Sequence, residues 1–352
     1  MRQIWITKKG APEVLQVKEA PDPEAGAGQV RIKVKCAGIN FADLAARAGI
    51  YPDAPKIPCV VGYEVSGVID QVGPPAPVTA PEGAPYRAAP PSDLKVGDQV
   101  FGMPRFGGYT DTLVLPAGQV FRMPAKMTFE EAAALPVVYL TAHHMLMFTG
   151  YLRPDSRILI HSAAGGVGLA AIQLARTRNC EIFGTASASK HDYLRAQGVA
   201  HPIANEGYIE AIRSIIGKDG GLDLVLDPVG GPSWGDGYDL LGPAGRLVCF
   251  GFSAGLKDKT VSWLSVIGAF LKIRKYSPIK LMDANKTVSG VNMGHLFDRL
   301  DLLRPQFEAL IRMYEEGAIK PTVDKTFPFS EAAAAHHYLH DRKAKGKVLL
   351  TP

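Results

Sequence analysis

The fold is decided by one stretch of sequence, which reads Arg157-Ile158-Leu159-Ile160 and, two residues later, Ala163-Ala164-Gly165-Gly166-Val167-Gly168. The first part favours a short strand and the second opens an apolar helix. A dinucleotide site needs such a turn, because the chain must leave room for a pyrophosphate and direct free helix N–H groups at it. Gly165 and Gly168 fill the second and third glycine positions of GxGxxG, and Ala163 stands at the first. The stretch predicts a dinucleotide site, with an unliganded glycine turn as the alternative.

Outward from this stretch, strands and helices alternate along the chain. The apolar runs predict strands at 158–161, 181–185, 222–226 and 246–251, and helices at 166–176, 190–197, 209–216 and 234–241. Strands that alternate with helices are typical of a parallel sheet covered by helices. We therefore expect an α/β, doubly wound Rossmann domain.

The flanking sequence differs in kind, and 352 residues exceed what one hydrophobic core usually fills. Short runs at 29–35, 60–72 and 98–101, broken by Gly and Pro, predict a mainly β domain before the Rossmann domain. Residues 73–93 are rich in Pro, Ala and Gly and predict a surface loop. At the C-terminal end we expect helices at 306–316 and 330–341 and strands at 320–329 and 347–350.

The second Rossmann strand indicates which nucleotide binds. NADH sites usually have Asp or Glu there, which accepts hydrogen bonds from the ribose and would repel a 2′-phosphate. This chain instead reads Gly184-Thr185-Ala186-Ser187-Ala188-Ser189-Lys190. The segment has no acid, and its hydroxyls and Lys190 suit a phosphate, so NADPH is the predicted cofactor. The alternative is that Ser187 and Ser189 only cap the helix beginning at Lys190.

Composition excludes several classes of protein. The formal charge of +5 is scattered, without the long basic run and interleaved aromatics of a nucleic-acid groove. No segment has the ~20 apolar residues of a membrane span or the apolar run of a signal peptide. The four cysteines are widely spaced without a CxxC pair, which favours reduced thiols over disulfides or a cysteine-rich zinc lobe. We expect a cytoplasmic protein that does not bind nucleic acid.

Several separated motifs carry a family resemblance. Residues 36–43, which read CAGINFAD, and Gly62-Tyr63-Glu64, with the glycine loop and GTASASK, closely resemble the zinc-free quinone oxidoreductase branch of the medium-chain dehydrogenase/reductase superfamily. Within that branch they look nearest to the vesicle amine transport protein 1 (VAT-1) group. The resemblance implies a GroES-like, mainly β catalytic domain from residues 1–126 and 296–352, a Rossmann NADP-binding domain over 127–295, and a homodimer.

The same resemblance also indicates whether the chain binds zinc. Zinc-dependent members hold the catalytic metal at positions that correspond here to Asn40, Tyr63 and Val137. This set lacks the thiolate, imidazole and carboxylate ligands that zinc needs, and Glu64 alone does not replace them. We therefore expect no metal site.

Without zinc, the acceptor must already be electrophilic, as a quinone or a carbonyl-conjugated alkene is. By resemblance, Asn40, Asp43 and Tyr51 are the candidate catalytic residues, with Asn40 and Tyr51 orienting or polarising the acceptor oxygen. For Asp43 a helix-capping role is the alternative.

The remaining candidate residues concern the cofactor. The candidate residues in the loop are Ala164, Gly165, Gly166, Val167 and Gly168, and those after the second strand are Thr185, Ser187, Ser189 and Lys190. The resemblance implies further contacts from Thr141, Asn205, Gly251, Phe252 and Arg342. Arg342 is expected to reach the adenosine phosphate, because a guanidinium suits a phosphate. A solvated terminal charge cluster is its alternative. Asn205 stands where relatives often have Tyr, which weakens that contact.

The predicted function is a zinc-independent, NADPH-dependent reductase of quinones or enones. One alternative is a pathway-specific reductase of enoyl thioesters or polyketide intermediates. Another is a VAT-1-like nucleotide-binding protein that acts through membranes or protein partners. The apolar segment 261–275 with its basic end is expected to form a substrate wall or dimer contact, an ordinary core helix, or a membrane-surface helix.

Overall fold

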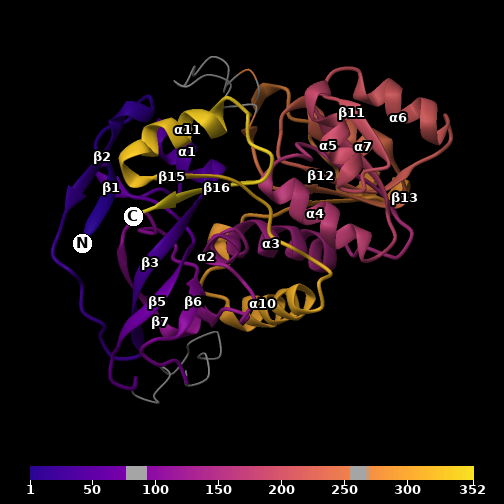
Figure 1. Ribbon diagram of the computed structural model, residues 1–352. Helices are drawn as coiled ribbons and strands as arrows, with labels where there is room; N and C mark the ends of the chain where they lie inside the picture. The colour runs from indigo at the N-terminus through magenta and orange to yellow at the C-terminus, as the bar shows by residue number, and fades with distance from the viewer. Residues whose placement is uncertain (77–92, 254–267, 269) are drawn as a thin grey trace. The chain divides into compact units, whose positions relative to one another are not determined.

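The chain forms two compact units. The structure is a computed structural model that describes residues 1–76, 93–253, 268 and 270–352 (Figure 1). Unit 1 comprises Met1–Leu140 and Met293–Pro352, and unit 2 comprises Thr141–Asn292. The observed divisions fall 14 residues after and three residues before the expected divisions at 126/127 and 295/296. The predicted combination of a mainly β unit with a parallel-sheet unit is confirmed.

Unit 2 is a six-stranded sheet in the order β11-β10-β9-β12-β13-β14, with every neighbouring pair parallel. The strands are β9 (Arg157–Ile160), β10 (Glu181–Ala186), β11 (His201–Ala204), β12 (Leu222–Asp227), β13 (Leu241–Cys249) and β14 (Thr287–Gly290). The helices are α4 (Gly166–Arg176), α5 (His191–Ala196), α6 (Tyr208–Ile216), α7 (Pro232–Leu240) and α9 (Pro278–Ala284). The predicted strand and helix alternation is confirmed.

The strand order places the ligand crevice of unit 2. From β9 the chain builds β10 and β11 on one side, then returns to add β12 on the other. Such a reversal leaves a crevice at the carboxyl ends of the two central strands. On one sheet face, Leu159, Phe183 and Val225 form a buried core with Ile212 of α6 and Leu240 of α7. The core therefore holds the strand ends that carry the glycine loop in fixed positions.

Unit 1 contains a three-stranded sheet, β2-β1-β4, and a seven-stranded sheet, β15-β16-β3-β5-β6-β8, in which β7 also pairs with β3. Its strands are β1 (Arg2–Ile6), β2 (Leu15–Glu19), β3 (Gln29–Ile39), β4 (Cys59–Val60), β5 (Val65–Val72), β6 (Gln99–Gly102), β7 (Thr112–Pro116), β8 (Val120–Arg122), β15 (Val323–Pro328) and β16 (Lys347–Thr351). The helices are α1 (Phe41–Ala48), α2 (Phe129–Ala133), α10 (Leu300–Glu315) and α11 (Ala332–His340). A further helix, α3 (Pro136–His143), contains the division between the units. In Figure 1, α11 lies beside β15 and β16, which it contacts.

Two elements of unit 1 differ from the expected ones. The predicted strand 60–72 is broken between β4 and β5, where Gly62 adopts a left-handed φ of 102° and donates its N–H to the Asp43 carboxylate at 2.9 Å. The last long helix, α10, begins at Leu300 although Pro305 lies inside it. Phe307 of this helix packs on Phe121, with ring centroids 4.4 Å apart. Burial of the apolar face thus outweighs the proline that marks a boundary in the sequence.

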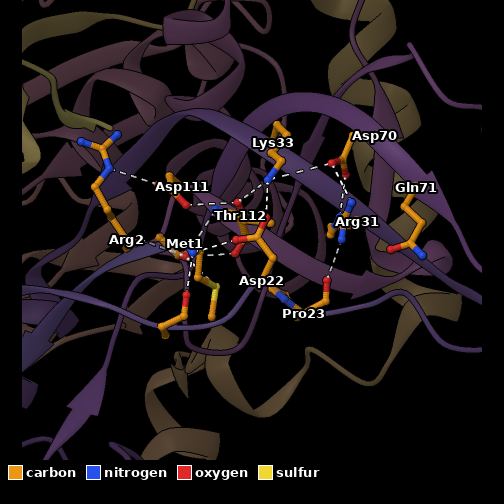
Figure 2. Close-up of polar contacts among 12 residues, drawn as sticks. Met1, Arg2, Asp22, Pro23, Arg31, Lys33, Asp70, Gln71, Asp111 and Thr112 are labelled. Carbon is orange, nitrogen blue, oxygen red and sulfur yellow. Dashed lines mark hydrogen bonds and ion pairs between the residues drawn. The ribbon is translucent and has the colours of Figure 1, made fainter.

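Ion pairs cross the outer surface of β3 (Figure 2). Arg31 donates two hydrogen bonds to Asp70, at 2.9 and 3.0 Å, and Lys33 contacts Asp22 at 2.7 Å. These side chains are partly exposed, and exposed pairs contribute only about 0–1 kcal/mol each. The charged groups of this cluster are paired with one another across the neighbouring strands β3 and β5.

Two expectations fall wholly or partly outside the described residues. These are the surface loop 73–93, of which 77–92 is not described, and the apolar segment 261–275, of which 261–267 and 269 are not described. Within the described ranges, no helix combines the length and the apolar character that crossing a membrane would require.

Candidate functional site

The glycine loop lies at the carboxyl end of β9. Ser162 has a left-handed φ of 55°, and its carbonyl accepts the Gly165 N–H at 2.9 Å, which closes the turn into α4. A Cβ at Gly168 would lie 2.5 Å from the Ala163 carbonyl oxygen, so packing requires glycine there. Gly165 is the N-cap residue of α4 and makes no side-chain cap. The first N–H groups of α4 thus lack intrahelical acceptors, which is the arrangement that binds a phosphate.

Thr185 supports this loop from the neighbouring strand. Its side chain is 1% exposed, and its hydroxyl oxygen lies 3.1 Å from His161 Nδ1 and accepts the Ser162 N–H at 3.3 Å. Its carbonyl accepts the Ala163 N–H at 3.0 Å. The hydroxyl predicted to face the cofactor therefore faces the loop, whose position it fixes.

The polar residues expected near a 2′-phosphate follow β10 directly. Ser187 and Ser189 are exposed, with hydroxyl oxygens 3.3 Å apart, and Lys190 is half-buried. Ser187 is the N-cap residue of the short helix Ala188–Lys190, and Lys190 that of α5, but neither caps through its side chain. Capping therefore does not account for the Ser187 hydroxyl, which favours the phosphate interpretation.

The positions of the other predicted cofactor contacts say less about cofactor binding. Asn205 is exposed just after β11, and Phe252 is half-buried after β13, with its ring 5.9 Å from that of Trp234. Arg342 is exposed in unit 1, after α11, with a left-handed φ of 56°. The structure also places three predicted contacts in unit 2, in buried or half-buried positions: Thr141, Ala164 and Gly251.

Sequence reasoning missed a buried pair at the same strand ends. His161 follows β9 and Asp227 ends β12, and His161 Nε2 lies 3.9 Å from Asp227 Oδ2. The other carboxylate oxygen accepts the N–H groups of Val229 and Gly230, at 2.6 and 3.2 Å. Burial lowers the pKa of His161. Adjacency to the glycine loop in sequence is the signal that could have pointed to His161.

In unit 1, Asn40 belongs to a buried polar network with Glu64 and Lys347, called here the acceptor-side network. Asn40 Nδ2 donates to Glu64 Oε1 at 2.8 Å, and Lys347 Nζ donates to Asn40 Oδ1 at 2.6 Å. Lys347 and Glu64 also form an ion pair, with side chains only 3% and 0% exposed. The amide of Asn40 is thereby held in one orientation, since its oxygen faces a cation and its nitrogen a carboxylate.

Strand register and a glycine make this network possible. β16 runs antiparallel to β3 with Val348 opposite Ile39, which brings Lys347 beside Asn40. A Cβ at Gly38 would overlap the Glu64 side chain. In the sequence, Glu64 was considered only in relation to zinc. Lys347 was not a candidate, because 307 positions separate it from Asn40 and no local pattern joins the two.

Asp43 caps the start of α1, which is the alternative role that the sequence suggested for it. Its carboxylate accepts the Asn40 N–H at 2.8 Å and the Gly62 N–H at 2.9 Å. Burial raises its pKa to about 7. Asp43 therefore fixes the start of α1 and the backbone on which Asn40 stands. Tyr51, the third candidate, is half-buried, with its ring edge-on to Tyr63 at a centroid distance of 6.5 Å.

Two of the three positions that hold zinc in related dehydrogenases, Asn40 and Val137, donate hydrogen bonds to Glu64 in this chain. Glu64 Oε1 accepts from Asn40, and Oε2 accepts the Val137 N–H at 2.8 Å. An amide, a phenol and an aliphatic side chain at Asn40, Tyr63 and Val137 do not match the ligands of zinc. Within residues 1–76, 93–253, 268 and 270–352, no three His, Cys, Asp or Glu side chains gather as metal ligands. Zinc does not fit this donor set.

Two family profiles match the chain. That of the alcohol dehydrogenase GroES-like domain matches residues 26–125, and that of the zinc-binding dehydrogenases matches residues 199–350. A relative from Rattus norvegicus, the synaptic vesicle membrane protein VAT-1 homolog, is 40% identical over 341 residues, 96% of this chain and 80% of the relative.

Solved structures give the same relationship. The Escherichia coli quinone oxidoreductase complexed with NADPH is similar with a TM-score of 0.84 and 28% identity, covering 100% of both chains. The CurK enoyl reductase is similar with a TM-score of 0.82 and 27% identity, covering 99% of this chain and 98% of that one. These similarities extend over both units.

Proposed function

Because the chain belongs to the medium-chain dehydrogenase/reductase superfamily, with VAT-1 homologues among its relatives, we propose that it is a zinc-independent, NADPH-dependent oxidoreductase whose acceptor is a quinone or a carbonyl-conjugated alkene. The observation that carries the proposal is the glycine loop together with the exposed hydroxyls of Ser187 and Ser189. The segment 184–190 has no acid to repel a 2′-phosphate. The NADPH complex of the similar E. coli enzyme supports the same cofactor.

In this proposal unit 2 binds the dinucleotide. The first turn of α4 holds the pyrophosphate on backbone N–H groups, and Ser187, Ser189 and Lys190 hold the 2′-phosphate. The fit rests on the Gly168 contact, where a side chain would displace the helix from the loop. When bound, NADPH supplies the hydride. Asn205, Gly251, Phe252, Thr141 and Arg342 are further proposed contacts.

Unit 1 supplies the acceptor side. Asn40 has one amide hydrogen left after its bond to Glu64, and this hydrogen and the Tyr51 hydroxyl orient the acceptor oxygen. Lys347 and Glu64 set the direction of that amide, and Asp43 sets its backbone. Neutral donors polarise a carbonyl less strongly than a metal ion does. The acceptor must therefore bring its own electrophilicity, as quinones and enones do.

The test is NADPH oxidation by the purified protein with benzoquinone, cyclohexenone and an alkenal, each against a control without acceptor. The proposal expects acceptor-dependent loss of NADPH absorbance that survives dialysis against EDTA. Asn40→Ala should lower kcat/KM about 10-fold or more, the effect of one lost hydrogen bond to a developing charge, while NADPH affinity stays unchanged. A panel of quinones and enones that leaves NADPH untouched would show the proposal to be wrong.

The similarity to an enoyl reductase favours a second acceptor class, enoyl thioesters of a biosynthetic pathway. Its chemistry is the same, because the thioester carbonyl also activates the conjugated alkene. Comparing kcat/KM for an enoyl-thioester analogue and for benzoquinone separates the two classes.

Four exposed apolar side chains within residues 270–282 favour a third candidate, action at a membrane surface. Phe270, Leu271, Ile279 and Met282 are 61%, 82%, 72% and 76% exposed, and the exposed Lys272, Lys275 and Lys280 lie beside them in sequence. Apolar and cationic side chains together suit an anionic lipid surface. Flotation with anionic vesicles tests this candidate, with Leu271→Ser and Met282→Ser as variants that should abolish binding. If the wild-type protein does not float with the vesicles, this candidate is excluded.

Quaternary structure and location belong to the proposal as well. β14 ends the strand order of unit 2 and pairs only with β13 among the described residues, so its outer edge suits the homodimer expected from the sequence. Sedimentation at several protein concentrations measures the oligomeric state. A cytoplasmic location is proposed on the sequence alone, and fractionation checks it.

A further inference from the structure

Tyr63 carries a buried hydroxyl for which the proposed function has no use so far. Its side chain is 4% exposed, and its hydroxyl oxygen finds no hydrogen-bond partner in the part of the chain that the structure describes. A buried hydroxyl without a partner costs about 1–3 kcal/mol, and such groups in native proteins call for an explanation. Tyr63 directly precedes Glu64, in the break between β4 and β5. It therefore lies in sequence next to the acceptor-side network.

Aromatic rings surround Tyr63. The ring of Phe106 is 5.2 Å away, that of Phe297 is 6.1 Å away, and that of Tyr51 stands perpendicular at 6.5 Å. All four residues belong to unit 1. Apolar walls with a few convergent polar groups are typical of sites for small ligands. Flat conjugated molecules suit such walls, because aromatic faces and edges pack well against them.

Both hydroxyls of this cluster are hydrogen-bond donors at neutral pH. Burial is the main cause that raises the pKa of Tyr63 and of Tyr51, and the Asp43 carboxylate adds to the rise at both. The two neighbouring hydroxyls also act on each other, which raises the pKa of Tyr63 and partly offsets the rise at Tyr51. A phenol kept protonated in an apolar setting can donate to a ligand oxygen without competition from water. Among the described residues, the Tyr63 hydroxyl is thus a donor without an acceptor.

We propose that Tyr63 is a catalytic residue that donates a hydrogen bond, together with Tyr51, to the carbonyl oxygen of a flat, conjugated acceptor. The inference rests on the proposed function and names a further residue for it. Tyr63 and Tyr51 are called the phenol pair below. Phe106 and Phe297 restrict the acceptor to planar molecules, so the pair selects quinones and cyclic enones over saturated ketones.

The chemistry balances without another reactant. Hydride adds to the electrophilic carbon, the electron pair of the conjugated system moves to the carbonyl oxygen, and the phenol pair donates hydrogen bonds to that oxygen. A proton from solvent then completes the reduced product, and NADPH leaves as NADP⁺. The phenols stabilise the negative oxygen and are not consumed.

The test compares Tyr63→Phe with the wild-type protein by infrared spectroscopy of bound cyclohexenone carrying a ¹³C carbonyl, without cofactor. Donation by Tyr63 lowers the carbonyl stretching frequency, so Tyr63→Phe should raise it. The matched control is Tyr338→Phe, another phenol of unit 1 whose hydroxyl already bonds Asp324 at 2.9 Å, and it should leave the frequency unchanged. Thermal unfolding of Tyr63→Phe should occur at the same or a higher temperature, because the variant loses an unsatisfied group.

Kinetics gives the second readout. Tyr63→Phe should lower kcat/KM for quinone and cyclohexenone by roughly 10²-fold, the usual effect of removing one donor to a developing oxyanion, with unchanged NADPH affinity. A purely structural hydroxyl would lower the unfolding temperature and leave the infrared band in place, and that result overturns the proposal. So does the absence of any bound carbonyl signal at saturating cyclohexenone. If the wild type binds the carbonyl with the expected shift but never oxidises NADPH, the proposed function fails while the role of Tyr63 in binding stands.

Discussion

The proposed nucleotide site of unit 2 and the acceptor-side network of unit 1 are built in opposite ways. The proposed nucleotide site consists of two short segments: the glycine loop 162–168, which offers backbone N–H groups, and residues 187–190, which carry the exposed hydroxyls. The acceptor-side network brings together side chains from β3, the β4–β5 break and β16, and buries them. The first is local and open to a ligand. The second is non-local, and its members are bonded mostly to one another, with one amide hydrogen of Asn40 left for a ligand.

This difference predicts whether a mutation in each region changes ligand affinity or protein stability. A change in the nucleotide site should alter ligand affinity while the fold persists, because few protein contacts depend on it. A change in the acceptor-side network should alter stability first, because buried charges without partners are costly. The following variants test this contrast.

The largest expected effect is that of Lys347→Met. This variant leaves the fully buried Glu64 carboxylate without its cation, which typically costs about 3–5 kcal/mol of unfolding free energy. Urea unfolding measures it. The control Lys343→Met removes an exposed lysine that lies 3.4 Å from Asp341, and it should change stability by less than about 0.5 kcal/mol. Equal effects of the two variants would contradict the description of the network as a buried, mutually dependent set.

Gly168→Ala should act next most strongly, and on binding. The added methyl group would lie 2.5 Å from the Ala163 carbonyl oxygen and push α4 from the loop, an overpacking strain of about 1–3 kcal/mol. NADPH affinity, measured by calorimetry, should fall about 10- to 100-fold. Gly290→Ala is the control, because the one described atom that its Cβ would meet is the Cys249 carbonyl oxygen, at 4.0 Å. Full NADPH affinity in Gly168→Ala would show that the loop does not hold the phosphates.

Ser187→Asp should have the smallest and most selective effect. An acid at this exposed position repels a 2′-phosphate, so NADPH should bind roughly 10-fold more weakly while NADH binding is unchanged. Ser214→Asp adds the same charge at an exposed position on α6 and should affect neither nucleotide. If Ser187→Asp weakens both nucleotides equally, the segment 187–190 does not read the 2′-phosphate.

The same contrast explains what the sequence could predict. The glycine loop and the segment after β10 depend on residues within a few positions of one another, so their spacing predicts strand, turn, helix and cofactor together. The parallel sheet follows from a repeated pattern of the same local kind. Gly168 illustrates this, because the residue in the motif is the one whose Cβ the fold excludes.

The acceptor side could be predicted only in part. Asn40, Asp43 and Tyr51 were reached through resemblance, but their partners depend on strand register. Lys347 meets Asn40 because β16 pairs with β3, and no pattern around position 347 foretells that pairing. Tyr63 was considered only as a residue unsuited to zinc. Its unpartnered hydroxyl becomes visible only when the surrounding rings are in place.

The most direct measurement of the central claim follows deuterium from NADPH labelled at the nicotinamide C4 into cyclohexenone, using protein dialysed against EDTA. The account predicts that the label appears on the β-carbon of the saturated product, at the same rate before and after metal removal. Loss of the reaction on dialysis with recovery on adding zinc, or a product without the label, would contradict it.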